Sequence, residues 1–102
     1  MSIRPMAPCT LVLLTYIKPI EEIDRLRPAH VEWIERAMDE GVMLLAGRRT
    51  PPTGGVLLFR GIPDMVEPVA KSDPFVVEGA ATMELVSFTA SFAADAMDGL
   101  FE

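Results

Sequence analysis

The sequence predicts an α+β domain in which an antiparallel sheet of four strands carries two helices on one face. Three observations lead to this fold class. Apolar runs rich in Val, Leu, Phe and Thr alternate with helix-like segments in the order β-α-β-β-α-β. A Pro- and Gly-rich stretch at residues 50–55 joins the second and third strands, as in a hairpin with a long loop. The chain has 102 residues, which is enough for one hydrophobic core and one domain.

The element boundaries follow from prolines, glycines and apolar runs. Residues 1–8 carry two prolines and little pattern, so we expect a loose leader before a single domain over residues 9–102. Proline is favoured at the first helical position and disfavours helix just before it, so we expect the main helix to begin at Pro28. The expected strands are Leu11–Ile17, Val42–Arg49, Val56–Arg60 and Thr82–Phe92. The expected helices are a short turn over Ile20–Leu26, the main helix from Pro28 to about Glu40, a second helix over Pro63–Lys71 and a short helix in the tail after Ala93. This order is that of the split βαβ, or ferredoxin-like, fold.

The predicted strands are apolar on both faces. In the first strand, Leu11 and Leu13 point to one face, and Val12 and Leu14 point to the other. The predicted helices cover only one face of the sheet, and 50% of the residues are hydrophobic, which is much for a small domain. We therefore expect a homodimer that packs sheet against sheet and covers the second face.

The charge and the cysteine content exclude several classes of partner. A net charge of −6 argues against nucleic acid, which needs a basic patch, and against an anionic membrane surface. No apolar run approaches the roughly 18 residues of a spanning helix, and the segment Cys9–Ile17 lacks the cleavage site of a signal peptide. A single cysteine fits a reducing compartment, so we expect a cytoplasmic protein.

The only histidine, His30, is the first candidate for chemistry. In the predicted helix it shares a core-facing stripe with Ile34 and Met38, so its ring must find a polar partner or stay neutral. Asp73, which precedes Pro74, is the second candidate. Two interpretations stay open: a core histidine bonded to a backbone carbonyl beside a simple helix N-cap, or a carboxylate that orients a catalytic imidazole.

Three short motifs carry a family resemblance. They are R-P-A-H at residues 27–30, E-G-V-M-L-L-A-G at 40–47 and D-P-F at 73–75. In this order and at these intervals they resemble the YciI-like family of small dimeric α/β-barrel proteins. The resemblance implies a ferredoxin-like fold that dimerises into an α/β barrel, and an active site built on a His–Asp pair, here His30 and Asp73. One branch resembles a dehydrochlorinase of a chlorinated hydroxyhydroquinone, and the related muconolactone isomerases act on small ring compounds.

Arg48 and Arg49 depart from the family pattern, which has proline or another small residue at this point. Neighbouring strand residues point to opposite faces, so at most one arginine enters a given cavity. There Arg48 would clamp a carboxylate or phenolate with two hydrogen bonds, and the alternative is a solvated strand end. Tyr16 would donate a hydrogen bond to a ligand oxygen, or lie at the edge of the core with its hydroxyl in water.

The remaining residues show no pattern of a nucleophile, a metal site or a nucleotide site. Cys9 has no neighbour in the sequence that would lower its pKa, and no G-x-S-x-G is present. One histidine and one cysteine give no metal-ligand spacing, and Gly54-Gly55 lacks a nucleotide-binding context. We expect no cofactor; haem on His30, as in some other dimeric α/β barrels, is a third possibility.

The leading hypothesis is a small-molecule enzyme in which His30 transfers protons and Asp73 orients it. The expected reactions are isomerisation, elimination or dehydrochlorination of a small cyclic or phenolic compound. The alternative is a dimer that binds a small ligand, or serves as an accessory subunit, without turnover. Both hypotheses place the polar pair beside an apolar cavity between the main helix and the sheet.

Overall fold

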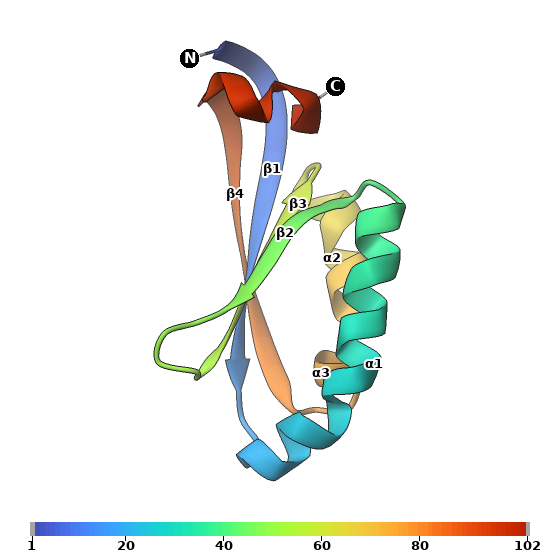
Figure 1. Ribbon diagram of the computed structural model, residues 1–102. Helices are drawn as coiled ribbons and strands as arrows, with labels where there is room; N and C mark the ends of the chain where they lie inside the picture. The colour runs from blue at the N-terminus through green and yellow to red at the C-terminus, as the bar shows by residue number, and fades with distance from the viewer. Residues whose placement is uncertain (1, 102) are drawn as a thin grey trace.

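The computed structural model describes residues 2–101 and has the predicted order of strands and helices (Figure 1). The elements are β1 (Ser2–Tyr16), α1 (Ile20–Asp39), β2 (Met43–Arg48), β3 (Gly54–Arg60), α2 (Pro63–Lys71), α3 (Pro74–Val77), β4 (Ala81–Ala93) and a final 3-10 helix (Asp95–Phe101). The helix α2 has the bounds that the sequence predicted. No helix in the described range is both long enough and apolar enough to cross a bilayer.

The four strands form one antiparallel sheet in the order β2-β3-β1-β4. The strand β1 lies inside the sheet, between β3 and β4, and β4 forms an edge. Because β3 lies between β1 and β2, the two βαβ halves of the chain interlock. Figure 1 shows α1, α2 and α3 on the same side of the sheet. This is the ferredoxin-like arrangement that the order of elements predicts.

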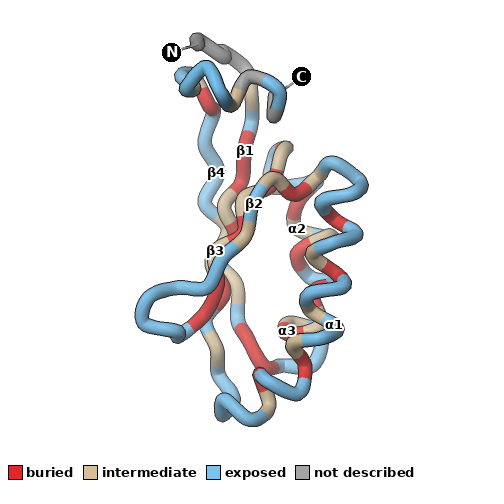
Figure 2. The backbone as a smooth tube through the Cα atoms, in the orientation of Figure 1, coloured by how far each residue is buried: buried red, intermediate tan, exposed pale blue. Residues whose placement is uncertain are grey.

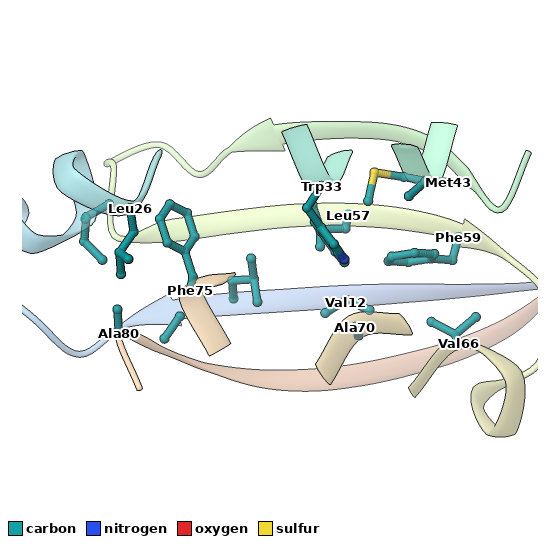
Figure 3. Packing of buried hydrophobic residues seen from close by; sticks show 14 residues of the cluster. Val12, Leu26, Trp33, Met43, Leu57, Phe59, Val66, Ala70, Phe75 and Ala80 are labelled. Carbon is teal, nitrogen blue, oxygen red and sulfur yellow. The ribbon is translucent and has the colours of Figure 1, made fainter. Parts of the chain in front are cut away.

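The hydrophobic core lies between the sheet and the helices (Figure 3). Val12, Leu57 and Phe59 contribute to it from the sheet, Trp33 from α1 and Ala70 from α2. Full burial of one large apolar side chain stabilises the fold by about 1.5–3 kcal/mol. These contacts hold α1 against the sheet and so fix which of its side chains face the sheet.

The strand β1 starts earlier than predicted. Residues 2–8, which we expected to form a loose leader, lie in β1. Ser2 and Ile3 pair with the end of β4, and the pairing resumes at Ala7 after a shift in register. The register of β1 with β3 begins only at Cys9, so one edge of this segment carries no β3 pairing. Prolines are tolerated at such an edge, because no ladder N–H is needed there.

Pro28 stands inside α1 rather than at its start, so the predicted break before it is wrong. The ring removes one N–H, whose acceptor would be the carbonyl of Asp24 one turn earlier. Both residues are exposed, so that carbonyl can face solvent instead. Leu26 and Trp33, on either side of the proline, are buried in the core and hold the helix together.

The face of the sheet opposite the helices carries a row of apolar side chains. The register places Leu58 of β3 beside Leu11 of β1 and Leu45 of β2, on the side away from Val12 and the core. Phe88 of β4 lies on this same face and is 43% exposed. Figure 2 shows exposed positions along much of β4.

Candidate functional site

A cavity of about 260 Å³ lies between α1 and the sheet. His30, Ile34 and Met38 line it from α1, as their common helical stripe predicts. The other lining residues are Leu14, Tyr16, Arg27, Val31, Ala46, Gly47, Arg48, Gly55, Leu57 and Phe75. A mostly apolar cavity with a few polar groups is typical of a small-ligand site.

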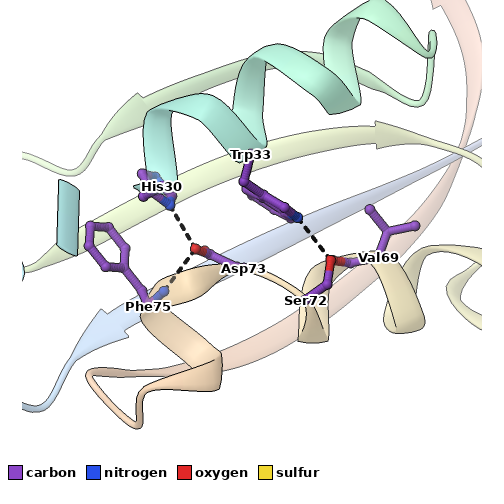
Figure 4. Close-up of polar contacts among 6 residues, drawn as sticks. All are labelled: His30, Trp33, Val69, Ser72, Asp73 and Phe75. Carbon is purple, nitrogen blue, oxygen red and sulfur yellow. Dashed lines mark hydrogen bonds and ion pairs between the residues drawn. The ribbon is translucent and has the colours of Figure 1, made fainter. Parts of the chain in front are cut away.

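His30 and Asp73 form a hydrogen-bonded pair. His30 Nδ1 lies 2.7 Å from Asp73 Oδ1, the His30 side chain is only 12% exposed and the Asp73 side chain is fully buried. The same oxygen of Asp73 accepts the backbone N–H of Phe75 at 3.0 Å and so caps α3 (Figure 4). Asp73 therefore caps α3 and also hydrogen-bonds the imidazole of His30.

The other carboxylate oxygen of Asp73, Oδ2, is buried without a hydrogen-bond partner in the described part of the chain. An unpaired buried polar atom costs folding free energy on the order of 1–3 kcal/mol. The helix cap uses only Oδ1, so it does not account for the burial of Oδ2.

The contact with Asp73 determines which ring nitrogen of His30 is free. An ionised carboxylate only accepts hydrogen bonds, so Nδ1 must donate and carry the proton. When the ring is neutral, the hydrogen-bond network therefore leaves Nε2 unprotonated. Because His30 lines the cavity and Nδ1 is engaged by Asp73, Nε2 is the nitrogen left for a ligand.

Two aromatic rings pack on the imidazole, and a hydrogen bond fixes one of them, Trp33. The Phe75 ring stacks on His30 with centroids 4.1 Å apart, and the Trp33 ring also stacks on it, with centroids 5.9 Å apart and planes inclined by 26°. Trp33 Nε1 donates to Ser72 Oγ at 2.9 Å, and this hydroxyl in turn donates to the Val69 carbonyl (Figure 4). Two adjacent residues, Ser72 and Asp73, thus connect the turn between α2 and α3 to α1.

The other predicted site residues divide clearly. Tyr16 and Arg48 line the cavity, whereas Arg49 does not line it and contacts Thr15 with a 3.5 Å hydrogen bond. One of the two neighbouring arginines therefore faces the cavity, as the alternation along a strand predicts.

Among the lining residues that sequence reasoning missed are Arg27 and Phe75. Both stand in the motifs that carry the family resemblance. Arg27 precedes His30 by three residues, a spacing that places both on one helix face. This spacing could have predicted that Arg27 lies near His30, whereas no local sequence pattern indicates that Phe75 stacks on the imidazole.

Comparison with known proteins identifies the family. The family model of the YCII-related domain matches residues 9–89. The chain belongs to the YCII-related family. A search of curated protein sequences returned no significant match.

Among solved structures, this YCII-related protein is similar to 5-chloro-2-hydroxyhydroquinone dehydrochlorinase (TftG) from Burkholderia phenoliruptrix AC1100 in complex with 2,5-dihydroxybenzoquinone. The sequence identity is 15% and the TM-score is 0.65, over 83% of this chain and 95% of the other. At this level of identity, the likeness shows a shared fold.

The cysteine of this YCII-related protein lies outside the cavity. Cys9 is buried in β1, and burial raises the pKa of its thiol, while the Arg60 cation lowers it in part. A thiol that resists ionisation is a poor nucleophile, as the sequence predicted.

Within the residues described, no three side chains of His, Cys, Asp or Glu gather closely enough to hold a metal ion.

Proposed function

We propose that this YCII-related protein is an enzyme that transfers protons on a small cyclic or phenolic substrate, with His30 as general base and acid. The observation that carries the proposal is the buried Asp73 carboxylate 2.7 Å from His30 Nδ1, beside an apolar cavity that the same ring lines. Asp73 orients the ring and stabilises the imidazolium that forms when Nε2 takes a proton. A positioned base of this kind contributes about 10²–10⁴ in rate.

The reaction begins when His30 Nε2 takes a proton from an acidic O–H or C–H of the substrate. The electron pair left behind forms a new double bond in the substrate. In a dehydrochlorination, chloride leaves with its bonding pair, so the products are an unsaturated ring compound, chloride and a proton. In an isomerisation, the imidazolium returns the proton to another atom of the ring. Neither case requires an oxidant, a reductant or a covalent bond to the protein.

The size and lining of the cavity support a single-ring substrate. Its volume of about 260 Å³ lies just below the roughly 300–1,000 Å³ of typical ligand pockets. We assign Tyr16 and Arg48, which line it, to hydrogen bonds with ligand oxygens. A hydroxyquinone or a small unsaturated lactone has the required ring, acidic proton and oxygens.

A panel of single-ring compounds tests this function: 5-chloro-2-hydroxyhydroquinone, 2,5-dihydroxybenzoquinone and five-membered unsaturated lactones. Chloride release and the absorbance spectrum report elimination, and proton NMR in D₂O reports isomerisation and exchange. We expect turnover by the wild type, a loss of about 10²–10⁴ in rate in His30→Gln with ligand affinity retained, and wild-type turnover in the exposed-site control Glu35→Gln.

The second candidate function is ligand binding without turnover, which the same cavity would serve. A compound of the panel that binds the wild type in calorimetry, but is neither eliminated, isomerised nor exchanged, supports this candidate. If a compound of the panel is turned over, unchanged turnover in His30→Gln would contradict the role proposed for the histidine.

We also propose that a second copy of the chain covers the open face of the sheet, as a homodimer. The apolar row there includes Leu45, Val86 and Phe88, each at least 41% exposed, which is unusual for the surface of a monomer. Sedimentation should give a dimer for the wild type and a monomer for Val86→Lys; a monomeric wild type would contradict the proposal.

The single cysteine supports a reducing location, and we assign the protein to the cytoplasm.

A further inference from the structure

Arg27 lines the cavity, but its guanidinium is only partly paired. Its Nη1 donates to Asp24 Oδ1 at 3.3 Å. Its Nη2 lies 3.1 Å from the same oxygen, but outside hydrogen-bond geometry. Nη2 is buried and has no hydrogen-bond acceptor in the described part of the chain.

The pairing with Asp24 is too weak to explain this buried nitrogen. The Asp24 side chain is 64% exposed, and ion pairs with exposed partners contribute little net stability. A buried guanidinium N–H without an acceptor is unfavourable, because the group lost its water and gained no partner. An acceptor atom on a ligand in the cavity would satisfy it.

The charged side chains that line the cavity are both positive. Arg27 of α1 and Arg48 of β2 line it from two different elements, and among the described lining residues none is Asp or Glu. The chain as a whole carries a net charge of −6. A positive lining in an acidic protein favours an anionic ligand over a neutral or cationic one.

We infer that the cavity takes a small ring compound with a planar oxyanion, a carboxylate or an enolate, and that Arg27 binds this oxyanion through Nη2, which lacks a hydrogen-bond acceptor in the described part of the chain. The inference rests on the proposed function for the identity of the site and adds the charge of the substrate. A guanidinium presents parallel N–H groups that match two oxygens of such an anion. Because Arg27 lies one helical turn from His30, the anion is held beside the proposed base.

Calorimetric titrations with matched pairs of probes test this inference. Benzoate is compared with benzamide, and the 2,5-dihydroxybenzoquinone anion is compared with neutral 2,5-dimethoxybenzoquinone. We expect the wild type to prefer the anion in at least one pair, and the preferred pair distinguishes a carboxylate from an enolate. Arg27→Met should weaken binding of that anion by about 10- to 100-fold and leave binding of its neutral partner unchanged. No preference for either anion in the wild type, or an equal effect of Arg27→Met on both members of a pair, overturns the inference.

Two controls separate an anion-binding role from a structural one. Arg25 is exposed on the same helix, pairs with Glu22 and does not line the cavity, so Arg25→Met should leave all affinities unchanged. In the free protein, Arg27→Met should leave the midpoint of urea unfolding unchanged or raised, because it removes a buried N–H that lacks a hydrogen-bond acceptor in the described part of the chain; a clearly lowered midpoint contradicts the inference. His30→Gln should lower turnover by about 10²–10⁴ and keep the anion preference, so failure of the proposed function and failure of this inference give different results.

Discussion

Replacing Asp73 with alanine is expected to lower the free energy of unfolding by about 1–2 kcal/mol. Two lost interactions set this magnitude, and removal of the buried, unpaired Oδ2 offsets part of their loss. The N-cap bond to the Phe75 N–H contributes about 1 kcal/mol. The His30 Nδ1–H, left without an acceptor in a side chain that is 12% exposed, adds about 1–3 kcal/mol. Asp73→Asn keeps an acceptor oxygen for both bonds and loses the charge, so its loss should be smaller, about 0.5–1.5 kcal/mol.

Urea unfolding, followed by far-ultraviolet circular dichroism, measures both Asp73 variants. All samples are compared at one protein concentration, because an oligomer makes the apparent stability depend on it. Glu35→Ala, at an exposed position of α1, is the control and should stay within about 0.5 kcal/mol of the wild type. A loss below about 1 kcal/mol in Asp73→Ala would refute the reasoning, because one cap bond alone gives that much. Equal losses in the alanine and asparagine variants would refute it as well.

Three further outcomes are expected. Phe75→Ala should lower the free energy of unfolding by about 3–5 kcal/mol in the same assay, because the ring is buried and packs on His30; a loss under about 1 kcal/mol would argue against that packing. Arg48→Met should weaken binding of 2,5-dihydroxybenzoquinone about tenfold in calorimetry, and Arg49→Met, which does not line the cavity, should leave it unchanged; equal effects would contradict the assignment. Burial raises the pKa of the Cys9 thiol, so the native protein should react with a disulfide reagent at pH 8 at least about tenfold more slowly than the urea-unfolded chain. For the same reason the free energy of unfolding should fall as the pH rises above about 8.5, since the unfolded thiol loses its proton first, and Cys9→Ala should lose this part of the pH dependence.

The order of elements could be predicted from local patterns because apolar runs, prolines and glycines mark most of the strands and helices. The hairpin loop, the second helix and the order of elements all came from the spacing of apolar residues, prolines and glycines. Pro28 shows where this reasoning fails. Locally it predicts the start of a helix, but the burial of Leu26 and Trp33 on either side holds one continuous helix across it. Burial is a property of the assembled fold, so no local rule could supply it.

The candidate site could be predicted only in part. His30 and Asp73 are 43 positions apart, and their pairing was indicated by the family resemblance rather than by their spacing. The partial pairing of Arg27 depends on which atoms the folded helix buries, and the stacking of Phe75 depends on the turn that Asp73 caps. Both features depend on the tertiary structure, although the helical spacing of Arg27 and His30 indicates that the two residues share one face of the helix.

The tautomer of His30 tests the central claim most directly. The chain has a single histidine, so a long-range ¹H–¹⁵N spectrum of the labelled protein, recorded where the ring is neutral, gives its two nitrogen signals without ambiguity. We predict a protonated Nδ1 and an unprotonated Nε2 in the wild type, and a loss of this preference in Asp73→Ala. A wild-type ring protonated at Nε2 would mean that Nδ1 does not donate to Asp73 and that no free base faces the cavity, which contradicts the proposed mechanism.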